Sequence, residues 1–221
     1  ESGIFGLNAA YPNYGYIGIP LVILAFGDQA ALPIGLILVA DTITLLTLTA
    51  FFVAGNELGP TAISMKMLQT VATNPLVLAV IAGITFSSTE LLMPKLPDVF
   101  LNMLAGAATP VALFALGATL FGQPVKNAIK ELSTLTVLKL VIHPLMISLF
   151  FIGIPGQNPL WIKVAIISSC LPIAANVFML ANHYNAYAGR SASAIFLTTI
   201  MASVSVPLFL YWLFSWDFMN F

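Results

Sequence analysis

The chain has 221 residues, of which 60% are hydrophobic and only 7% are charged, and its formal net charge is -1. Soluble domains carry roughly 25% charged residues, so this chain cannot bury its apolar surface in one water-facing globule. The small net charge gives no indication of a nucleic-acid partner or of a polybasic lipid-binding surface. The single cysteine, Cys170, excludes an intrachain disulfide and a cysteine-based metal cluster, and we expect no cofactor. We therefore predict an all-α polytopic membrane protein embedded in the lipid bilayer.

A helix needs about 20 apolar residues to cross a bilayer, and we predict seven such spans. The first, residues 11–27, contains several glycines and Pro20 and ends in a glycine turn. The second, residues 32–54, carries one acidic residue, Asp41, near its middle. The segment 61–71 is expected to form a short helix at the membrane interface.

Five further spans follow along the chain. They are expected at residues 74–93, 99–122, 134–153, 160–184 and 190–214, with a charged loop at 123–133. Asn74 and Pro75 fit the N-cap and the first position of a helix, and so mark the start of the third span. The fifth span carries Lys139 and His143, which are four residues apart and therefore lie on one helix face.

Two of the spans contain residues that interrupt a membrane helix. The stretch 170–182 (CLPIAANVFMLAN) carries Pro172 and Asn176 within an apolar span. Proline removes a backbone donor, and the carbonyls that it frees need partners that lipid cannot supply. The stretch 13–27 (NYGYIGIPLVILAFG) has a similar order of an asparagine, glycines, Pro20 and an apolar run. Two interrupted spans at corresponding places in two halves are typical of the midplane site of a secondary transporter.

A weak internal repeat relates these two spans. Setting Pro20 against Asn176 pairs LVILAFG with VFMLANH, and a two-residue insertion then brings Asp41 opposite Thr199. We therefore predict that residues 1–54 end a first inverted repeat, that residues 55–73 form a cytoplasmic linker, and that residues 74–221 form a second repeat of five spans. The loops after spans two, four and six carry more lysine and arginine than the opposite loops, which places them in the cytoplasm, at the inner or plasma membrane.

Several stretches, in order along the chain, resemble one known family. They are NYGYIGIPLVILAFG, TNPLVLAVIAG, GAATPVALFALGATL, KLVIHPL and LPIAANVFMLANHYNAYAGRSASAIFLTTIMASVSVPL. The ordered set resembles the auxin efflux carrier family, which includes plant auxin exporters and bacterial malonate and malate permeases. The resemblance implies a ten-span fold of two inverted five-span repeats, a scaffold part, a transport part with two crossing broken helices, and a homodimer. By that pattern the chain starts at the family's fourth span, so three spans would precede Glu1.

The interrupted spans supply the candidate substrate site. Its residues are Asn13, Gly15, Gly18, Pro20, Pro172 and Asn176. Half-helix N-termini present free N–H groups and a partial positive charge of about +0.5, which suits an anion. The asparagine amides add neutral donors, and the resemblance implies that related carriers bind organic anions at this crossing. Taken singly, each proline is equally explained as a kink that helps helices to pack.

Three ionisable residues are candidates for coupling transport to an ion: Asp41, Lys139 and His143. An acid at mid-bilayer costs about 2.5–3.5 kcal/mol on insertion scales, so Asp41 is either a structural carboxyl bonded to a threonine or a proton-coupling group. Lys139 either extends its charged end to the membrane interface or forms, with His143, a cationic face toward an anionic substrate. His143 precedes Pro144 and can also satisfy carbonyls that this proline frees.

These features predict a secondary transporter for a small organic anion, such as malonate, malate or an auxin-like acid, working by alternating access with a proton or the membrane potential. A sodium-coupled symporter of bile-acid-transporter-like fold is the alternative. A seven-span receptor fits the number of spans but not the two matched interruptions. An intramembrane enzyme would need paired aspartates or a Ser/His pair, whereas Asp41 is the only acid that we place within the membrane, so we predict no enzyme.

Overall fold

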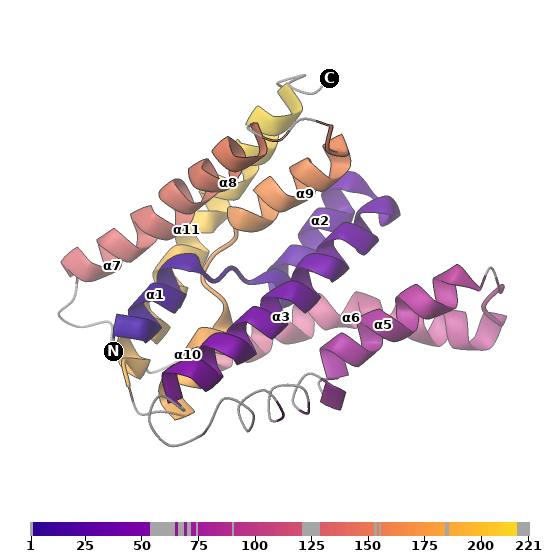
Figure 1. The fold of residues 1–221 in the computed structure, drawn as a ribbon, viewed down its shortest axis with the longest axis horizontal. Helices are drawn as coiled ribbons and strands as arrows, with labels where there is room; N and C mark the ends of the chain where they lie inside the picture. The colour runs from indigo at the N-terminus through magenta and orange to yellow at the C-terminus, as the bar shows by residue number, and fades with distance from the viewer. Residues whose placement is uncertain are drawn as a thin grey trace. The chain divides into compact units, whose positions relative to one another are not determined.

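The computed structural model describes residues 2–53, 65, 69, 72–73, 75–89, 91–120, 129–152, 154, 156–183 and 186–215. These residues form helices joined by short connections, and there is no strand among them (Figure 1). The elements in chain order are α1 (Ser2–Ala10), the π-helical turn η1 (Tyr14–Gly18), α2 (Ile19–Phe26), the 3₁₀ turn η2 (Asp28–Ala30), α3 (Ala31–Val53), α5 (Pro75–Ser88), α6 (Lys95–Leu120), α7 (Ile129–Val137), the π-helical turn η3 (Leu138–Ile142), α8 (His143–Ile152), α9 (Pro159–Ser169), α10 (Ala175–His183) and α11 (Ala188–Ser215).

Length and composition make several of these helices suitable for a bilayer. Among the described residues, the segments long and apolar enough to cross it are Asp28–Leu45, Ile129–Phe151 and Ala188–Ser215, and shorter apolar helices cover Tyr14–Phe26, Val77–Ser88 and Pro159–Ser169. Large apolar side chains also remain exposed on the helix surfaces, for example Leu24 and Phe114. Such surfaces suit contact with lipid. The predicted all-helical membrane architecture is confirmed, whereas the number of seven spans and the inverted repeat stay predictions.

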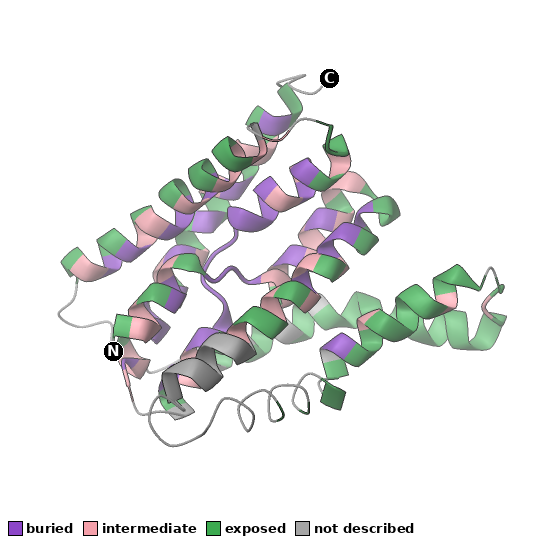
Figure 2. Ribbon diagram, in the orientation of Figure 1, coloured by how far each residue is buried: buried purple, intermediate pink, exposed green. Residues whose placement is uncertain are grey.

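The chain divides into two compact units, one formed by residues 1–34 with 105–221 and the other by residues 35–104. In the first unit, α9, α10 and α11 supply most of the core, and their facing sides are the buried parts in Figure 2. Ile167, Val177 and Ile195 are fully buried there. Burying such side chains stabilises the fold by about 1.5–3 kcal/mol each.

The second unit contains most of α3, with α5. Gly35 lies on α3 where a Cβ atom would be 3.5 Å from Val80 Cγ1 of α5, so the two helices pack closely at this point. The start of a helix at Pro75 is confirmed, while its expected cap Asn74 lies outside the described residues. The interfacial helix expected at 61–71 also lies outside them, apart from two isolated positions.

Most predicted helix positions agree with the structure, and the charged loop at 123–133 is the main exception in the second half of the chain. The predicted loop was wrong from Ile129 onward, because α7 begins there. Glu131 lies in the first turn of α7, where a carboxylate is favourable beside the free N–H groups. Arg190 at the start of α11 also pairs with Glu131, so this turn is held by a distant part of the chain.

Candidate functional site

The first interruption separates α1 from η1 and consists of Tyr11, Pro12 and Asn13, all buried. Asn13 caps the helix that follows, since its Oδ1 accepts a hydrogen bond from the Tyr16 N–H at 3.2 Å. The interruption predicted in the stretch 13–27 lies at its first residue, Asn13, and not at Pro20. Pro20 lies within a continuous helical run from Tyr14 to Phe26, where α2 follows directly from η1. The helix before the break, α1, was also missing from the predicted first span.

The second interruption separates α9 from α10 and spans residues 170–174, all buried. Pro172 lies at its centre, so the break predicted there is confirmed. The next residue, Ile173, donates its backbone N–H to Thr198 Oγ1 of α11 at 3.3 Å, and this hydroxyl donates in turn to the Ala194 carbonyl at 2.8 Å. A side chain of α11 thus satisfies a backbone donor that the break leaves open.

The two interruptions lie against each other and exchange backbone hydrogen bonds, as one step of an antiparallel ladder. The Asn13 N–H donates to the Pro172 carbonyl at 2.9 Å, and the Ala174 N–H donates to the Tyr11 carbonyl at 3.0 Å. Figure 1 shows the two extended segments passing each other between α1, α9 and α10. Because lipid offers no hydrogen bonds, each interruption is stabilised by the other.

Close packing at this crossing depends on Gly18. A Cβ atom at this buried position would lie 2.8 Å from Leu171 Cδ1 and 3.4 Å from the Asn13 carbonyl oxygen. Gly15 lies in the same turn and is half-buried. The backbone contact pairs Pro12 with Ile173.

A cavity of about 410 Å³ lies beside the crossing, within the unit of residues 1–34 and 105–221. Pro20 and Pro172 both line it, so the structure brings two of the predicted site residues together. Its walls are mainly apolar side chains of α2 and α11. The hydroxyl groups that reach it belong to Tyr16, Thr199 and Ser203.

The two predicted asparagines occupy different surroundings. Asn13 is 3% exposed, and its Nδ2 has no hydrogen-bond partner among the described residues. Asn176 lies exposed in the first turn of α10 and does not line the cavity. The first turn of a helix leaves its N–H groups without intrahelical acceptors, so Asn176 and Ala175 add backbone donors beside the second interruption.

Lys139 is fully buried within the helical run from Ile129 to Ile152, so its predicted extension to the membrane interface was wrong. Its Nζ lies 2.9 Å from His143 Nδ1, which confirms that the two residues share a face. Nζ also donates to the carbonyl of Ser169, the last residue of α9, at 3.1 Å. A cation at the C-terminus of a helix offsets the partial negative charge of its free carbonyls.

Asp41 belongs to the other unit, in which it is half-buried on α3. The neighbouring Thr42 and Thr44 donate their hydroxyl protons to backbone carbonyls one turn earlier, at 2.8 Å each. A coupling role for Asp41 stays a prediction.

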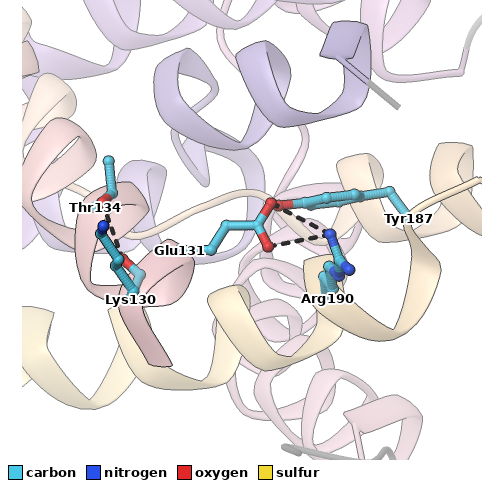
Figure 3. A network of polar contacts seen from close by, with 5 residues as sticks. All are labelled: Lys130, Glu131, Thr134, Tyr187 and Arg190. Atoms are coloured by element: carbon cyan, nitrogen blue, oxygen red, sulfur yellow. Dashed lines mark hydrogen bonds and ion pairs between the residues drawn. The ribbon is translucent and has the colours of Figure 1, made fainter. Parts of the chain in front are cut away.

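A polar cluster at the turn from α10 to α11 was not predicted from the sequence (Figure 3). The Tyr187 hydroxyl donates to Glu131, and Arg190 Nη1 lies 3.1 Å from Glu131 Oε2. Burial, followed by the hydrogen bond to Glu131, raises the pKa of the Tyr187 phenol well above its usual range, so it stays protonated and donates. Tyr187 has φ +66°, a conformation that is strained for a bulky side chain.

A side-chain hydrogen bond between α1 and α11 was likewise not predicted from the sequence. Asn8 is fully buried and donates through Nδ2 to Ser191 Oγ at 2.8 Å and to the Ile4 carbonyl at 2.9 Å. The partners in this contact and in the Tyr187 cluster are far apart in sequence, so no local motif marks them. The position of the first interruption, by contrast, could have been predicted from the dipeptide Pro12-Asn13, since proline ends a helix and asparagine caps the next.

Apolar helices, two of them interrupted and crossing through backbone hydrogen bonds, define a multi-pass membrane protein of the kind in which secondary transporters build their sites. The family model described as "Membrane transport protein" matches residues 1–210. The chain therefore belongs to this family, the auxin efflux carrier family, and the expected resemblance is confirmed.

Three similar proteins illustrate the relationship. A "Putative malonate transporter" of Rhizobium meliloti (strain 1021) is 32% identical over 96% of this chain and 67% of its own length. "Uncharacterized transporter YfdV" of Escherichia coli (strain K12) is 22% identical over 96% of this chain and 68% of its own length. An "Uncharacterized transporter" of Methanothermobacter thermautotrophicus is 28% identical over 90% of this chain and 64% of its own length. The chain thus spans about two thirds of the length of these relatives.

Replacing Gly18 by alanine should destabilise the crossing, because the new Cβ would lie 2.8 Å from Leu171 Cδ1. Overpacking of a core costs about 1–3 kcal/mol, which should lower the Tm of the full-length protein in detergent. Gly6→Ala is the matched control, since nothing lies within 4 Å of its Cβ position and alanine favours a helix. A Tm equal for the two variants would contradict the proposed close approach at Gly18.

Replacing Tyr187 by phenylalanine should lower the free energy of unfolding by about 1 kcal/mol, because the Glu131 carboxylate loses a donor. The exposed Arg190→Gln should cost less, as surface ion pairs contribute about 0.2–1 kcal/mol. Since folding raises the pKa of Tyr187, its contribution is complete below about pH 10 and declines at higher pH. The free energy of unfolding, measured from pH 8 to 11, should decline in this way in the wild type. An equally steep decline in Tyr187→Phe would refute the assignment of this pH dependence to Tyr187.

Proposed function

We propose that the chain forms the substrate-handling part of a secondary transporter for a small organic anion, a mono- or dicarboxylate. The observation that carries the proposal is the crossing of the two interruptions, at which the Asn13 N–H donates to Pro172 and the Ala174 N–H donates to Tyr11. Interrupted helices are retained within a membrane where they line a polar site, because the break is otherwise unfavourable.

The polar groups around this crossing favour an anion over a cation. Asn13 contributes a buried Nδ2 that still has donor capacity, and the first turn of α10 contributes its N–H groups and the amide of Asn176. On the opposite side of the second break, Lys139 occupies the carbonyl end of α9. The N–H donors of α10 and Asn13 are therefore available to a ligand, whereas the Ser169 carbonyl at the end of α9 already accepts from Lys139. This arrangement suits a negatively charged carboxylate.

The cavity beside the crossing supports a substrate that is small and partly apolar. Its walls combine apolar side chains with the phenol of Tyr16, which can donate to a carboxylate. The hydroxyls of Thr199 and Ser203 already donate to backbone carbonyls one turn earlier. The name of the Rhizobium relative supports malonate among the candidates, beside malate and auxin-like acids.

Transport would proceed by alternating access, with the two crossed helices moving together past a scaffold. The driving force would be the membrane potential or a proton, and the loops after spans two, four and six would face the cytoplasm. The carrier would act as a homodimer, and a sodium-coupled symporter is the alternative. Imposing proton, sodium and potential gradients one at a time on the same vesicles separates these driving forces.

Full-length protein in proteoliposomes should take up labelled malonate, malate or indole acetate, and Asn176→Ala should raise KM about tenfold or more, because a hydrogen bond to a charged group contributes about 1.5–3 kcal/mol. Asn176 is exposed, so its truncation should leave the Tm unchanged. The control is Asn182→Ala, an exposed asparagine farther along α10, which should keep the wild-type KM. Absence of uptake for all three acids, or an equal KM in both variants, would count against the proposed site.

A further inference from the structure

A buried lysine lies directly behind the second interruption. Lys139 is fully buried in a helical run suited to span the membrane, where a cation is costly unless it has a function. It lies in η3, a π-helical turn between α7 and α8. Such turns add a residue to a helix and are frequent at functional sites. Here the turn places Lys139 and His143 together against the end of α9.

The contacts of Lys139 connect it to the geometry of the break. Its Nζ donates to the Ser169 carbonyl, and Ser169 is the last residue of α9 before the interrupted segment that carries Pro172. An anion bound at the crossing would therefore lie near the ammonium group. Opposite charges at short range stabilise each other, more strongly where water is excluded.

His143 supplies a path for a proton. At 2.9 Å, His143 Nδ1 accepts from Lys139 Nζ when the lysine is an ammonium, and the ring proton is then on Nε2. Nδ1 also lies 3.2 Å from the Ser169 carbonyl, to which it can donate when it carries the ring proton and the lysine is neutral. The side chain of His143 is only partly buried, unlike that of Lys139. The imidazole is therefore the more exposed member of the pair.

Few other titratable groups among the described residues face this pair. The elements packed against the pair are α1, α7, α8 and α11, together with α9, which carries Lys163. The described residues of α1 include no titratable side chain, and α8 contributes only His143 itself. The remaining groups are the Cys170 thiol beside Ser169, Lys130 and Glu131 at the far end of α7, and Arg190 and Tyr211, both exposed, on α11.

We infer that Lys139 and His143 form a proton relay that binds one proton with each anion, an inference that rests on the proposed function. While the anion is bound, Nζ is an ammonium that donates to Ser169 and to His143 Nδ1. When the anion leaves, Nζ gives one proton to Nδ1, and Nε2 gives its proton to water. Both side chains are then neutral, and their hydrogen bond persists with Nδ1 as the donor.

Linkage makes this coupling reciprocal. If the anion favours protonated Lys139, then protonation of Lys139 raises the affinity for the anion by the same factor. Protons and anions would consequently cross the membrane together, and a pH difference would drive accumulation. Lys139 acts here on the substrate through charge and through the carbonyl end of α9, so it is a positioning and coupling residue.

Proton uptake by purified full-length protein tests the relay directly. On addition of malonate, malate or indole acetate in weak buffer, the wild type should take up about one proton for each anion bound. Lys139→Arg keeps a cation and a donor for Ser169 but does not release its proton, so it should bind the anion with no proton uptake. Lys163→Arg, a half-buried lysine of α9, is the matched control and should behave as the wild type.

Proteoliposomes give a second readout. With the membrane potential clamped at zero and an exterior one pH unit more acidic, the wild type should accumulate the anion about tenfold. Lys139→Arg should only equalise its concentration across the membrane, while anion exchange without a gradient continues. Continued exchange shows that the variant is folded and still binds its substrate.

The outcomes separate the two proposals. If the wild type neither binds nor transports any of the acids, the proposed function fails, and the relay fails with it. If the wild type transports but takes up no proton, or if Lys139→Arg takes up as many protons as the wild type, only the relay is overturned. Should Lys139→Arg not fold, His143→Gln decides, because it keeps the buried lysine and removes the proton acceptor. Unchanged gradient-driven accumulation in His143→Gln would then overturn the relay.

Discussion

The structure depends on one constraint: a helix interrupted inside a membrane frees backbone groups that lipid cannot satisfy. Here each interruption supplies what the other lacks, since the Asn13 N–H donates to Pro172 and the Ala174 N–H donates to Tyr11. Thr198 Oγ1 of α11 accepts a hydrogen bond from the Ile173 N–H, so a third helix also stabilises the interrupted backbone. Separating the two helices would expose all of these groups at once. Backbone hydrogen bonds therefore hold the two interruptions together, which suits the proposed movement of the crossed helices as one body.

The pattern of hydrogen bonds at the crossing also leaves N–H donors available and covers carbonyl acceptors, which favours a negatively charged ligand. The carbonyl end of α9 is covered by Lys139, whereas the amide end of α10 is left open around Asn176. The cap at Asn13 uses the side-chain oxygen and leaves its Nδ2 as a buried donor. A cation site would require the opposite, with open carbonyls and covered amides. The proposed selectivity for an anion would therefore follow from the same hydrogen bonds that hold the broken helices in place.

Much of this could be predicted from the sequence, because apolar runs and helix-breaking residues are local signals. The break at Pro172 and the shared face of Lys139 and His143 were predicted correctly. The first break was misplaced at Pro20, since a proline within a continuous helical run and one that ends a helix look alike when only apolar residues surround them. The burial of Lys139 depends on Ser169, and that of Tyr187 on Glu131. Neither pairing leaves a periodic pattern, so only the fold reveals them.

The arrangement of α11 suggests how a bound substrate could affect the crossing. Thr198 supports the interrupted backbone at Ile173, and the next residue, Thr199, lines the cavity. Successive helix residues point about a quarter-turn apart, so one short stretch of α11 faces both the break and the cavity. Its N-terminal turn is held by Tyr187, whose strained φ of +66° costs about 1–3 kcal/mol and persists because Glu131 and Arg190 fix the turn. Because Thr198 and Thr199 are neighbours on α11, we expect a shift of this stretch beside the cavity to move the hydrogen bond at the break as well.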